Sequence, residues 1–595
     1  MDKFLEGIKI FFDWLITGFS NIIVEIGMVL QDSTIGIMGI YTFSVRWWCP
    51  ILAILIFFRC ILPLLHDKGY DVVWANLAIP NGHSIPLKHW ENSIGRSKLS
   101  DIVINFPFIS RSHGVLSYDG DNWTITDLAS KGGIKVNGER ITKTGRVEEG
   151  DTISFANAEF LLLAPESGHE NIPTIGYLKW FSGFGKDFIS RKTLFMIIAF
   201  QILGGIQIAF SAKDEMKLTI LFTILIFTVA ECFYFFAISK FSKKYSELEL
   251  MAFFLSGLSL LIIGSAAPPQ LLLKQLIAIT TGIAVYFVIQ LIVKDLSRAN
   301  KLKYILIAGA IILLVLNLVI GEARFGAKNW INLGFITFQP MEFVKIAFVL
   351  AGTATLDKLL TARNLTAFIG FSAACIIVLV LISDLGTAAV FFGAFLVISF
   401  MRSGDLRTIA FIASGAALGA MAIIMLMPYI ALRFKAWRHV WEFADTIGYQ
   451  QTRTMIASAS GGLMGVGGGN GYLVNVAASD TDLVFGILCE EWGLIIALIA
   501  VLMLVFFAFS TIFITNRCKS SFYAIAACGV ASIFLIQTAL NVFGSVDLLP
   551  LTGITLPFIS NGGSSMVASW GLLAFIKTAD DRYRPEIVNN NEVNG

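Results

Sequence analysis

The chain reads Ser479-Asp-Thr-Asp-Leu-Val-Phe-Gly-Ile-Leu-Cys-Glu-Glu-Trp-Gly493 where a glycine-rich polar loop runs directly into a long apolar segment. Four acidic side chains therefore lie at or inside a membrane boundary: Asp480, Asp482, Glu490 and Glu491. A carboxylate at that depth costs several kcal/mol, about 2.5–3.5 on insertion scales, so we expect each one to have a partner or a task. A buried ion pair or a cap on the following helix is the structural alternative to a functional role.

The composition indicates a multi-spanning membrane protein. Of the 595 residues, 56% are hydrophobic and only 14% are charged, which is too apolar for an ordinary soluble chain. The net charge of +2 is too small to indicate a nucleic-acid partner. The seven cysteines show no Cys-x-x-Cys spacing, so we interpret them as small apolar residues rather than as a disulfide framework or a zinc site.

Two elements are expected in an N-terminal membrane segment over residues 1–68. Residues 1–30 alternate apolar and charged side chains, which predicts an amphipathic helix lying on the membrane surface. Residues 43–65 are apolar except for Arg46 and Arg59, which predicts one membrane-spanning helix. The pattern of a cleaved signal peptide is not found in this segment.

The pattern changes at Asp67, and residues 69–165 are expected to form a small all-β sandwich. Short apolar alternations are separated by hairpin-turn signals at Asn81-Gly82, Asp119-Gly120, Asn137-Gly138 and Glu149-Gly150. Strands are predicted over 74–79, 114–118 and 123–126 and within 153–163. Strands spaced this closely by such turns favour a sandwich of single-domain size.

Three motifs occur in this segment in the order Ile94-Gly-Arg96, Ser110-Arg-Ser-His113 and Asp127-Leu-Ala-Ser-Lys-Gly-Gly-Ile-Lys-Val-Asn-Gly138. They resemble the motifs of the forkhead-associated (FHA) domain, a phosphothreonine reader. A dianionic phosphate needs a guanidinium group together with hydroxyl and amide donors, and residues of these types are present.

By this resemblance, four residues would bind a phosphopeptide: Arg96, Ser110, Arg111 and Lys131. Arg96 and Ser110 would hold the phosphate with the help of Arg111, and His113 would brace the loop. The family motif has Asn-Gly where this chain has Gly132-Gly133, so the residue that grips the peptide backbone is missing, and Lys131 beside it would supply a different contact. The alternative is a domain kept only as a structural or docking module.

Residues 166–192 are expected to form a linker, followed by a polytopic membrane domain over 193–578 and a tail over 579–595. Most apolar runs in the membrane domain are close to the roughly 17–25 residues that a helical span needs. They predict about twelve spans in addition to the N-terminal one, near 193–211, 217–239, 250–268, 271–293, 303–320, 341–356, 366–382, 386–401, 408–427, 484–514, 521–542 and 560–576.

Basic residues gather at alternate ends of these spans, which predicts their orientation. By the positive-inside rule, the cytoplasmic side is marked by the lysines and arginines in 240–244, 294–303, 358–363, 402–407, 517–519 and 577–584. The sandwich, which joins the bundle through Arg191-Lys192, and the carboxyl tail are then expected to be cytoplasmic. Four segments are expected to face outward: 321–340, 383–384, 428–483 and 543–559. An irregular loop as long as 428–483 is usually functional in a compact protein.

Four stretches of the expected outward face carry a set of motifs in a fixed order. They are Gly326-Ala-Lys-Asn-Trp330 through Phe338-Gln-Pro-Met-Glu-Phe-Val-Lys345; Ser383-Asp-Leu-Gly-Thr387; Gly448-Tyr-Gln450 through Ser460-Gly-Gly462 with Thr481-Asp482 and Glu490-Glu-Trp-Gly493; and Leu549-Pro550 through Leu556-Pro-Phe-Ile-Ser-Asn-Gly-Gly-Ser-Ser565. In this order and spacing they resemble the SEDS family (RodA, FtsW and SpoVE), which are polytopic peptidoglycan glycosyltransferases of bacteria. The resemblance covers residues 300–578, and the family's usual ten spans would place the two extra spans before Trp330.

The resemblance implies polymerisation of lipid II on the outer face of the bacterial cytoplasmic membrane, with a class B penicillin-binding protein as partner. An α-linked donor that gives a β-1,4 bond requires inversion, hence one direct displacement with one general base. Asp482 matches the family's essential acidic position, although Leu483 replaces the aromatic residue that follows it, and Asp482 is our candidate base. Its low-dielectric surroundings are expected to raise its pKa.

Basic residues of the 428–483 loop are candidates for binding the departing pyrophosphate, which needs positive charge. They are Arg433, Lys435, Arg438 and Arg453. A divalent cation, Mg²⁺ or Mn²⁺, would assist them, but no spacing in the sequence locates its site. Contact with lipid headgroups is the alternative for each basic residue.

Further family positions are candidates for binding the substrate, and each has a structural alternative. Trp330 and Glu490 match positions of the family motifs, and Trp330 would form a wall for the saccharide unless it is an interfacial belt residue. Lys345 lies three residues after Glu342, which favours an intramembrane ion pair. Asp384 precedes a helix start, where it would serve as a cap. The glycines of 461–471 are expected to let the backbone approach a ligand or a neighbouring helix.

Four positions depart from the family pattern: Asp480 for His, Met341 for Ser, Arg453 for Gln and Asn561 for Tyr. Two aspartates at 480 and 482 would raise each other's pKa if both faced the cavity. We expect these departures to affect the rate, the pH optimum and the substrate detail, while the candidate base is retained.

Three functions are weighed on this basis. The leading hypothesis is a glycosyltransferase of cell division, elongation or sporulation whose FHA domain binds a phosphothreonine protein or another Ser/Thr kinase target. A lipid-linked precursor flippase would require a polar route through the bundle, whereas the charged residues cluster toward the outer edge. A catalytically silent scaffold that docks phosphoproteins would explain the departures, but not the presence of Asp482.

Overall fold

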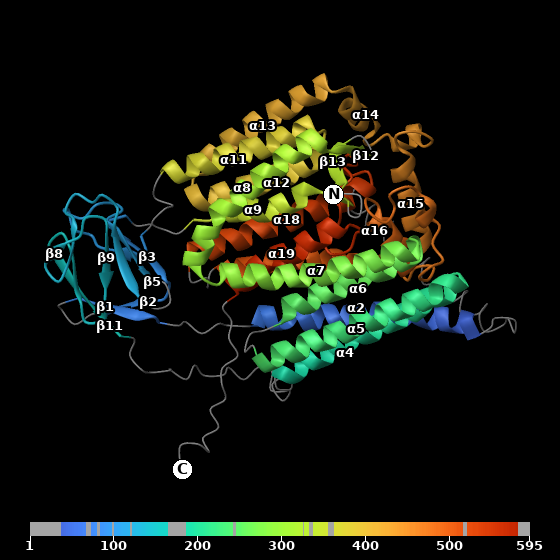
Figure 1. Ribbon diagram of the computed structural model, residues 1–595, viewed down its shortest axis with the longest axis horizontal. Helices are drawn as coiled ribbons and strands as arrows, with labels where there is room; N and C mark the ends of the chain where they lie inside the picture. Colours follow the sequence, from blue (N-terminus) through green and yellow to red (C-terminus); the bar gives the residue numbers. More distant parts are fainter. Residues whose placement is uncertain are drawn as a thin grey trace, which may run out of the picture.

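The chain folds into a β-sandwich and a bundle of long helices, which lie side by side in the computed structural model (Figure 1). The structure describes residues 37–66, 73–79, 84–97, 100–118, 122–164, 186–241, 246–324, 327–332, 337–354, 362–515 and 520–580. The amphipathic helix expected over residues 1–30, and most of the expected linker and tail, lie outside the described residues.

Two sheets form the sandwich, as the sequence predicts. One sheet has six strands in the order β2-β1-β11-β10-β7-β8, and the other has five in the order β4-β3-β5-β6-β9. Their pairings are antiparallel except for the parallel pair of β3 and β4. The strands are β1 (Ala75–Ala78), β2 (Ser84–Leu87), β3 (Glu91–Gly95), β4 (Ile102–Val103), β5 (Gly114–Tyr118), β6 (Trp123–Asp127), β7 (Ile134–Val136), β8 (Glu139–Arg140), β9 (Thr144–Val147), β10 (Thr152–Phe155) and β11 (Ala158–Leu163).

The sandwich closes on apolar side chains that alternate along its strands. Leu77 of β1 and both Ile153 and Phe155 of β10 are fully buried, as the two-residue period of a strand requires. The predicted Asn137-Gly138 turn joins β7 to β8 and has positive φ angles of 51° and 87°. This is the geometry of a tight type I′ hairpin, which explains the residue types found there.

Every span expected from the sequence coincides with a helix. The long helices are α2 (Ile37–His66), α4 (Lys186–Ser211), α5 (Asp214–Phe241), α6 (Glu247–Ala266), α7 (Pro269–Val293), α8 (Leu296–Ile320), α9 (Pro340–Gly352), α11 (Ala362–Leu381), α12 (Leu385–Ser403), α13 (Leu406–Leu426), α18 (Ser521–Ser545) and α19 (Gly563–Ala579). A further continuous span consists of α16 (Val484–Ile487), the π-helical turn η3 (Leu488–Trp492) and α17 (Gly493–Thr515).

The protein is therefore integral to a membrane. Within the described residues, nine helices are long and apolar enough to cross a bilayer, and α2 is one of them. The helix α9 has only 13 residues, and the apolar parts of α11 and α13 are also short. The expected count of about twelve spans plus one stays a prediction.

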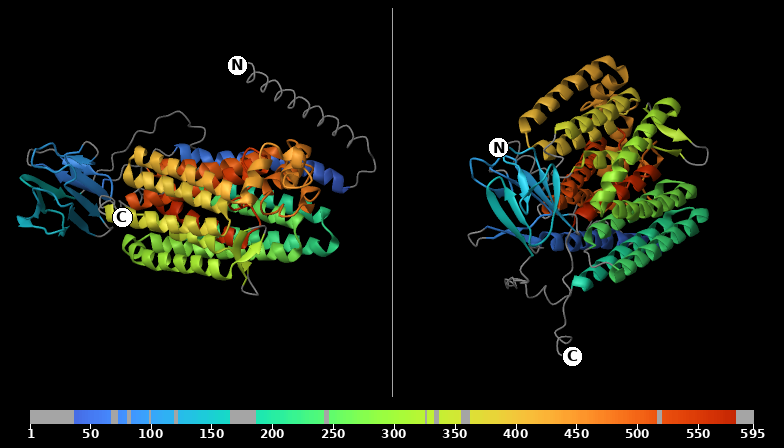
Figure 2. Two further views of the ribbon diagram at one scale, coloured as in Figure 1. Left: turned by 90° about the horizontal axis from the view of Figure 1, so that it is seen from above. Right: turned by 60° about the vertical axis from the view of Figure 1, so that its left-hand side comes forward.

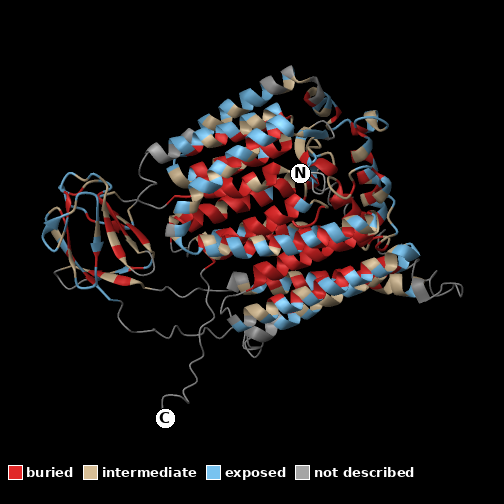
Figure 3. Ribbon diagram, in the orientation of Figure 1, coloured by how far each residue is buried: buried red, intermediate tan, exposed pale blue. Residues whose placement is uncertain are grey.

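The buried centre of the bundle is α6, whose residues are hidden along almost the whole helix (Figure 3). The helices α2, α4, α5 and α7 pack around it. On its other side α7 lies against α19, where a Cβ added at Gly282 would come within 3.1 Å of the Trp570 side chain. A glycine is needed at this crossing because two side chains would not fit between the helices.

Polar loops gather at the end of the bundle that lies away from the sandwich (Figures 1 and 2). A small sheet there consists of β12 (Glu322–Arg324), β13 (Ala327–Asn332) and β14 (Thr337–Phe338). The short helices α14 (Pro428–Ala436) and α15 (Tyr449–Gly461) and the 3-10 turns η1 (Val440–Phe443) and η2 (Leu473–Asn475) belong to the same end. The loops expected to share one face are thus brought together.

A buried ion pair joins two helices that are far apart in the sequence. Lys577 Nζ of α19 lies 2.9 Å from Glu249 Oε2 of α6, and both side chains are almost completely buried. Tyr286 Oη of α7 donates a 2.9 Å hydrogen bond to Glu249 Oε1. The buried carboxylate therefore has partners on both oxygens, which is the condition under which an interior charge is tolerated.

Removing one partner of this pair should be costly. Lys577→Met leaves the Glu249 carboxylate uncompensated in the interior, so we expect it to lower the unfolding free energy by about 3–5 kcal/mol. The double variant Glu249→Gln/Lys577→Met should lose much less, because no charge is left behind. Thermal unfolding of the detergent-solubilised protein measures both variants, and a Lys577→Met protein as stable as the wild type would contradict the argument.

Candidate active site and phosphopeptide site

Asp482 lies in a loop that α18 holds at the polar end of the bundle. Its amide donates to Ala478 O at 2.9 Å, and its carbonyl accepts a 3.0 Å hydrogen bond from Asn541 Nδ2. The same Asn541 amide donates to Ile554 O at 2.7 Å, so one side chain of α18 fixes two loops. In the second loop Gly553 has φ of +71°, and a Cβ there would lie 3.2 Å from Asp482 Oδ2. A glycine therefore gives the carboxylate the room that it needs.

The surroundings of Asp482 tune its acidity as the sequence predicts. Burial raises the pKa of its carboxyl group to about 6. A hydrogen bond from the Thr481 side chain and the charge of Arg433 lower this pKa, whereas Asp480 and Asp384 raise it. The group is thus ionised at neutral pH and still basic enough to accept a proton, as a general base must be.

Arg433, a candidate for binding the pyrophosphate, carries a charge that lowers the pKa of Asp482. Its Nη1 donates to Leu551 O at 3.0 Å, which ties α14 to the loop that contains Gly553. Lys435 and Arg453 are exposed and lie over the aromatic rings of Phe443 and Tyr449, at 5.9 Å and 5.1 Å from the ring centres. Their contact with pyrophosphate stays a prediction.

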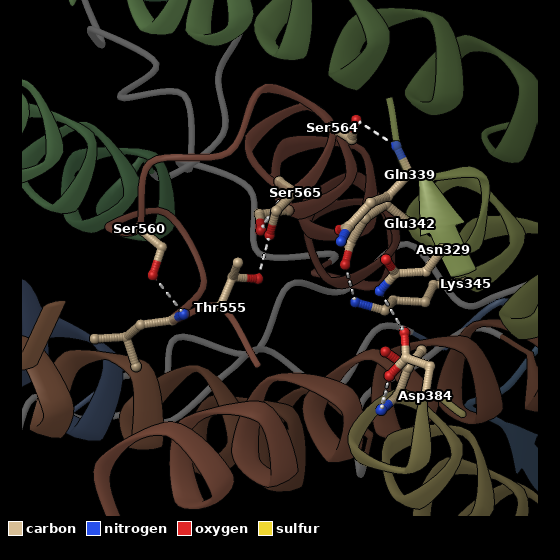
Figure 4. Close-up of polar contacts among 12 residues, drawn as sticks. Asn329, Gln339, Glu342, Lys345, Asp384, Thr555, Ser560, Ser564 and Ser565 are labelled. Atoms are coloured by element: carbon tan, nitrogen blue, oxygen red, sulfur yellow. Dashed lines mark hydrogen bonds and ion pairs between the residues drawn. The ribbon is translucent and has the colours of Figure 1, made fainter. Parts of the chain in front are cut away.

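Asp384 caps the N-terminus of α12, which is the structural role that the sequence predicts for it. Its Oδ1 accepts the amide of Thr387 at 3.1 Å at the start of α12. Its Oδ2 accepts Asn329 Nδ2 at 2.9 Å, which ties α12 to strand β13 (Figure 4). Trp330 follows Asn329 on that strand and is partly buried. A saccharide contact for Trp330 or Asp384 stays a prediction.

The expected intramembrane ion pair is confirmed. Lys345 Nζ lies 2.7 Å from Glu342 Oε1 on α9, and both side chains are buried (Figure 4). The amide of Gln339, at the start of this helix, donates to Ser564 Oγ at 3.0 Å. Met341, which departs from the family pattern, is buried as an apolar residue. The pair thus accounts for Lys345 without a ligand, and its expected substrate contact stays a prediction.

The Glu490 carboxylate binds the backbone that follows the glycine-rich segment, and its expected contact with substrate stays a prediction. Its two carboxylate oxygens accept the amides of Tyr472 and Leu473, each at 2.9 Å. The π-helical turn η3 frees backbone carbonyls, and those of Glu490 and Glu491 accept the amides of residues 466 and 467. A Cβ at Gly461 would lie 2.0 Å from Cys489 O, so the glycines serve close approach to a neighbouring helix.

Two departures from the family pattern contact each other. Asn561 Nδ2 donates to Asp480 Oδ2 at 2.6 Å, and the Asn561 amide donates to Asp480 O at 2.8 Å. Next to them, Ser560 Oγ donates to Thr481 O at 2.6 Å. The second aspartate is therefore occupied by an amide partner, and its effect on the pKa of Asp482 is smaller than that of burial.

Asn541 is the main residue of this site that the sequence analysis did not identify. It lies near the end of an apolar run, and an amide at that depth is itself an indication of function or of backbone pairing. No family motif contained it, and its contact with Asp482 joins positions 59 residues apart.

The loops that carry the candidate phosphopeptide-binding residues are braced from within the sandwich, as predicted. His113 is fully buried, and its Nδ1 accepts the amide of Ser110 at 3.1 Å, so its Nε2 donates to Gly133 O at 3.2 Å. The amides of Arg96 and Lys131 donate to the carbonyl and the hydroxyl of Ser110, at 2.9 Å and 3.1 Å. His113 thus braces the loop as expected.

Three exposed basic residues adjoin the partly buried Ser110 in the chain or through backbone hydrogen bonds: Arg96, Arg111 and Lys131. This arrangement presents a hydroxyl and several cations to solvent, which suits a dianionic phosphate.

The missing asparagine at Gly132 has a steric explanation. A Cβ added at Gly132 would lie 2.4 Å from the Cβ of Ala156, which is closer than two carbon atoms can approach. Ala156 itself has a φ of 53°, in the left-handed region that is unfavourable for a residue with a Cβ. The turn between β10 and β11 therefore occupies the space that a side chain at position 132 would need.

The fold and the two sites define a polytopic membrane protein that carries an FHA sandwich. The profile of the FHA domain matches residues 92–156. The profile of the FtsW/RodA/SpoVE family, described as "Cell cycle protein", matches residues 248–584, which is more than half of the chain. The protein belongs to this family. The helices α2, α4 and α5 precede the matched region.

Named relatives are similar over the membrane domain. The chain is 29% identical over 355 residues to "Probable peptidoglycan glycosyltransferase FtsW" of Bacillus subtilis, covering 53% of this chain and 84% of that protein. It is 30% identical over 328 residues to "Peptidoglycan glycosyltransferase RodA" of Mycobacterium tuberculosis, covering 51% and 69%. A solved structure described as "Structural coordination of polymerization and crosslinking by a peptidoglycan synthase complex" aligns with a TM-score of 0.48 at 25% identity, over 57% of this chain and 98% of that one.

The contact between Asp480 and Asn561 should appear as a coupling energy. Asp480→Ala and Asn561→Ala each remove the same hydrogen bond, so the double variant should lose less stability than the sum of the single losses. We expect a coupling of about 0.5–3 kcal/mol from the unfolding free energies of the four proteins. Additive losses would show that the two departures are independent.

The steric explanation for Gly132 can be tested by restoring the family residue. Gly132→Asn should lower the local stability of the sandwich by about 1–3 kcal/mol, because its Cβ collides with Ala156. Adding Ala156→Gly removes the colliding atom and should recover most of the loss. Hydrogen exchange of residues 127–136 in the full chain measures this stability, and a Gly132→Asn protein that exchanges like the wild type would contradict the explanation.

Proposed function

We propose that the protein is a peptidoglycan glycosyltransferase that polymerises lipid II at the outer face of the bacterial cytoplasmic membrane. The family membership and the names of its relatives support this reaction class. The observation that carries the proposal is Asp482, a carboxyl group with a pKa of about 6 at the polar end of the bundle. A base of this strength at this place suits a reaction between lipid-anchored sugars.

In the proposed reaction, Asp482 removes the proton from the 4-hydroxyl group of the acceptor sugar. The acceptor oxygen then forms a bond with the anomeric carbon of the donor, while the bond from that carbon to the undecaprenyl pyrophosphate oxygen breaks. One direct displacement inverts the configuration, which turns the α-linked donor into a β-1,4 product. The proton ends on Asp482, and the electron pair leaves with the pyrophosphate.

Positive charge near the leaving group is supplied in this proposal by Arg433, with Lys435 and Arg453 as exposed contacts for the lipid-linked pyrophosphate. The expected Mg²⁺ or Mn²⁺ has no ready cluster of protein ligands. In the part of the chain that the structure describes, no three His, Cys, Asp or Glu side chains converge. Asp480 and Asp384 are already occupied by asparagine amides, so we assign no step to a metal ion.

The proposed orientation puts the FHA domain and the carboxyl tail in the cytoplasm. The distribution of basic residues supports it, and so does the position of the sandwich at the end of the bundle opposite to the polar loops (Figure 1). Kinases and their substrates are then accessible to the FHA domain, while Asp482 is on the outer side with the glycan.

The partners proposed are a phosphothreonine protein for the FHA domain and a class B penicillin-binding protein for the membrane domain. The exposed cations around Ser110 support the first partner, since they match the charge of a phosphorylated peptide. The second follows from the family resemblance, because glycan strands need a transpeptidase to be crosslinked.

Replacing the proposed base should abolish synthesis without unfolding the protein. Asp482→Asn should lower lipid II polymerisation at least about 100-fold, the usual contribution of a general base. The matched control is Asp445→Asn, which changes an exposed acid of the same outward segment. Polymerisation is measured with the purified protein, alone and with a class B penicillin-binding protein.

The thermal stability of the Asp482→Asn variant checks that a loss of activity does not come from unfolding. The folded-state pKa is raised to about 6 from an ordinary value of 3.8, so the neutral form is favoured by folding. That contribution is present at low pH and is lost as pH rises through about 6. At pH 7.5 a neutral asparagine should therefore melt no lower than the wild type. Undiminished polymer from Asp482→Asn would eliminate this residue as the base.

A further inference from the structure

A buried carboxylate of the sandwich contacts the membrane domain. Glu91, the first residue of β3, is buried, although glutamate side chains are usually exposed. Its Oε1 accepts Ser520 Oγ at 2.8 Å, and its Oε2 accepts Ser521 Oγ at 2.6 Å and the Ser521 amide at 3.3 Å. These hydrogen bonds join positions about 430 residues apart in the sequence.

The partner of Glu91 is the N-terminus of α18. Ser520 is the N-cap of this helix and also accepts the Phe522 amide at 3.2 Å. A carboxylate at this place accepts a hydrogen bond from an amide that has no partner within the helix. Its negative charge also interacts favourably with the positive end of the helix dipole. Ser521 Oγ lies 3.4 Å from Ala354 O, which brings the end of α9 to the same contact.

The contact leaves the phosphopeptide loops free. Glu91 begins β3, whereas Arg96 follows its other end, so the two residues lie about 16 Å apart along an extended strand. The register agrees, because Glu91 pairs with Ser117 of β5 while Ile94 pairs with Gly114, next to the loop of His113. A phosphorylated partner can therefore bind at one end of the sandwich while the other end stays on α18.

The same helix reaches the proposed active site. From Ser521 to Asn541, α18 is one continuous helix about 30 Å long. Asn541 donates to the carbonyls of Asp482 and Ile554, and Gln451 Nε2 of α15 donates to Gly544 O at 2.9 Å. A displacement of α18 that begins at its first turn would therefore reach the loop that carries Asp482.

We propose that Glu91 is a docking residue through which the FHA domain controls the active site along α18. In the docked state Glu91 orders the first turn of α18, and Asn541 holds Asp482 in its working position. Release of Glu91 loosens both ends and lowers the rate. This inference rests on the proposed glycosyltransferase function, and it names the regulation of that site.

The test compares Glu91→Gln with Glu159→Gln in the full chain. Both variants neutralise a glutamate of the sandwich, but Glu159 is exposed on β11 of the six-stranded sheet, whereas Glu91 is buried on β3 of the five-stranded sheet. Two quantities are measured in nanodiscs: hydrogen exchange of residues 521–525 and 479–484, and the rate of lipid II polymerisation. Glu91→Gln should accelerate exchange in both segments and lower the rate about fivefold or more, the lower range of allosteric coupling. Glu159→Gln should change neither quantity.

A second variant keeps the test decisive. Ser521→Ala removes the contact from the membrane side, and the double variant Glu91→Gln/Ser521→Ala should be no slower than Glu91→Gln alone. The inference is overturned if exchange at 521–525 is unchanged in Glu91→Gln. It is also overturned if that exchange rises while the 479–484 segment and the rate stay as in the wild type. A wild-type protein that makes no polymer would refute the proposed function instead, and the two exchange measurements would still decide on the coupling.

Discussion

A side-chain amide of α18 joins the loop of the candidate base to a second loop at the polar end of this protein. Asn541 uses both of its N–H groups to pair the carbonyls of Asp482 and Ile554, at 3.0 Å and 2.7 Å. Irregular backbone at membrane depth is tolerated only where it is buried in protein or lines a water-filled cavity, so buried carbonyls need such partners. Because this amide projects from a 25-residue helix, the two loops are anchored to that helix. The position of the candidate base is therefore set by a helix that contributes no catalytic group.

The acidic residues of the bundle differ in what holds them. Glu342 and Glu249 are paired with lysines, Glu490 accepts two backbone amides, and Asp384 caps a helix. Each of these carboxylates thus has ionic or hydrogen-bonding partners within the protein, which is the condition for burying such a group. Asp482 is different, because burial outweighs the nearby Arg433 and its pKa rises to about 6. A loop carboxyl group whose surroundings disfavour its charge is suited to proton transfer.

Most of the fold could be predicted from local patterns, whereas the contacts that complete the sites could not. Apolar runs gave the helices, turn dipeptides gave the sandwich, and the spacing of Glu342 and Lys345 gave the ion pair, because each of these depends on neighbours in the sequence. Asp480 and Asn561 are 81 residues apart, and Glu91 and Ser520 are 429 apart. One sequence carries no signal for such pairs. The departure from the family motif at Gly132 likewise became intelligible only with Ala156 beside it.

The most direct test of the central claim is the pH dependence of lipid II polymerisation by the wild-type protein. If Asp482 is the base, kcat/KM should rise with pH and level off above an apparent pKa of about 6, since only the ionised carboxylate accepts the proton. This rise with pH should come from the catalytic step and not from the binding of lipid II. A profile without a limb between pH 5 and 7 (roughly one unit on either side of that value) would contradict the assignment of Asp482.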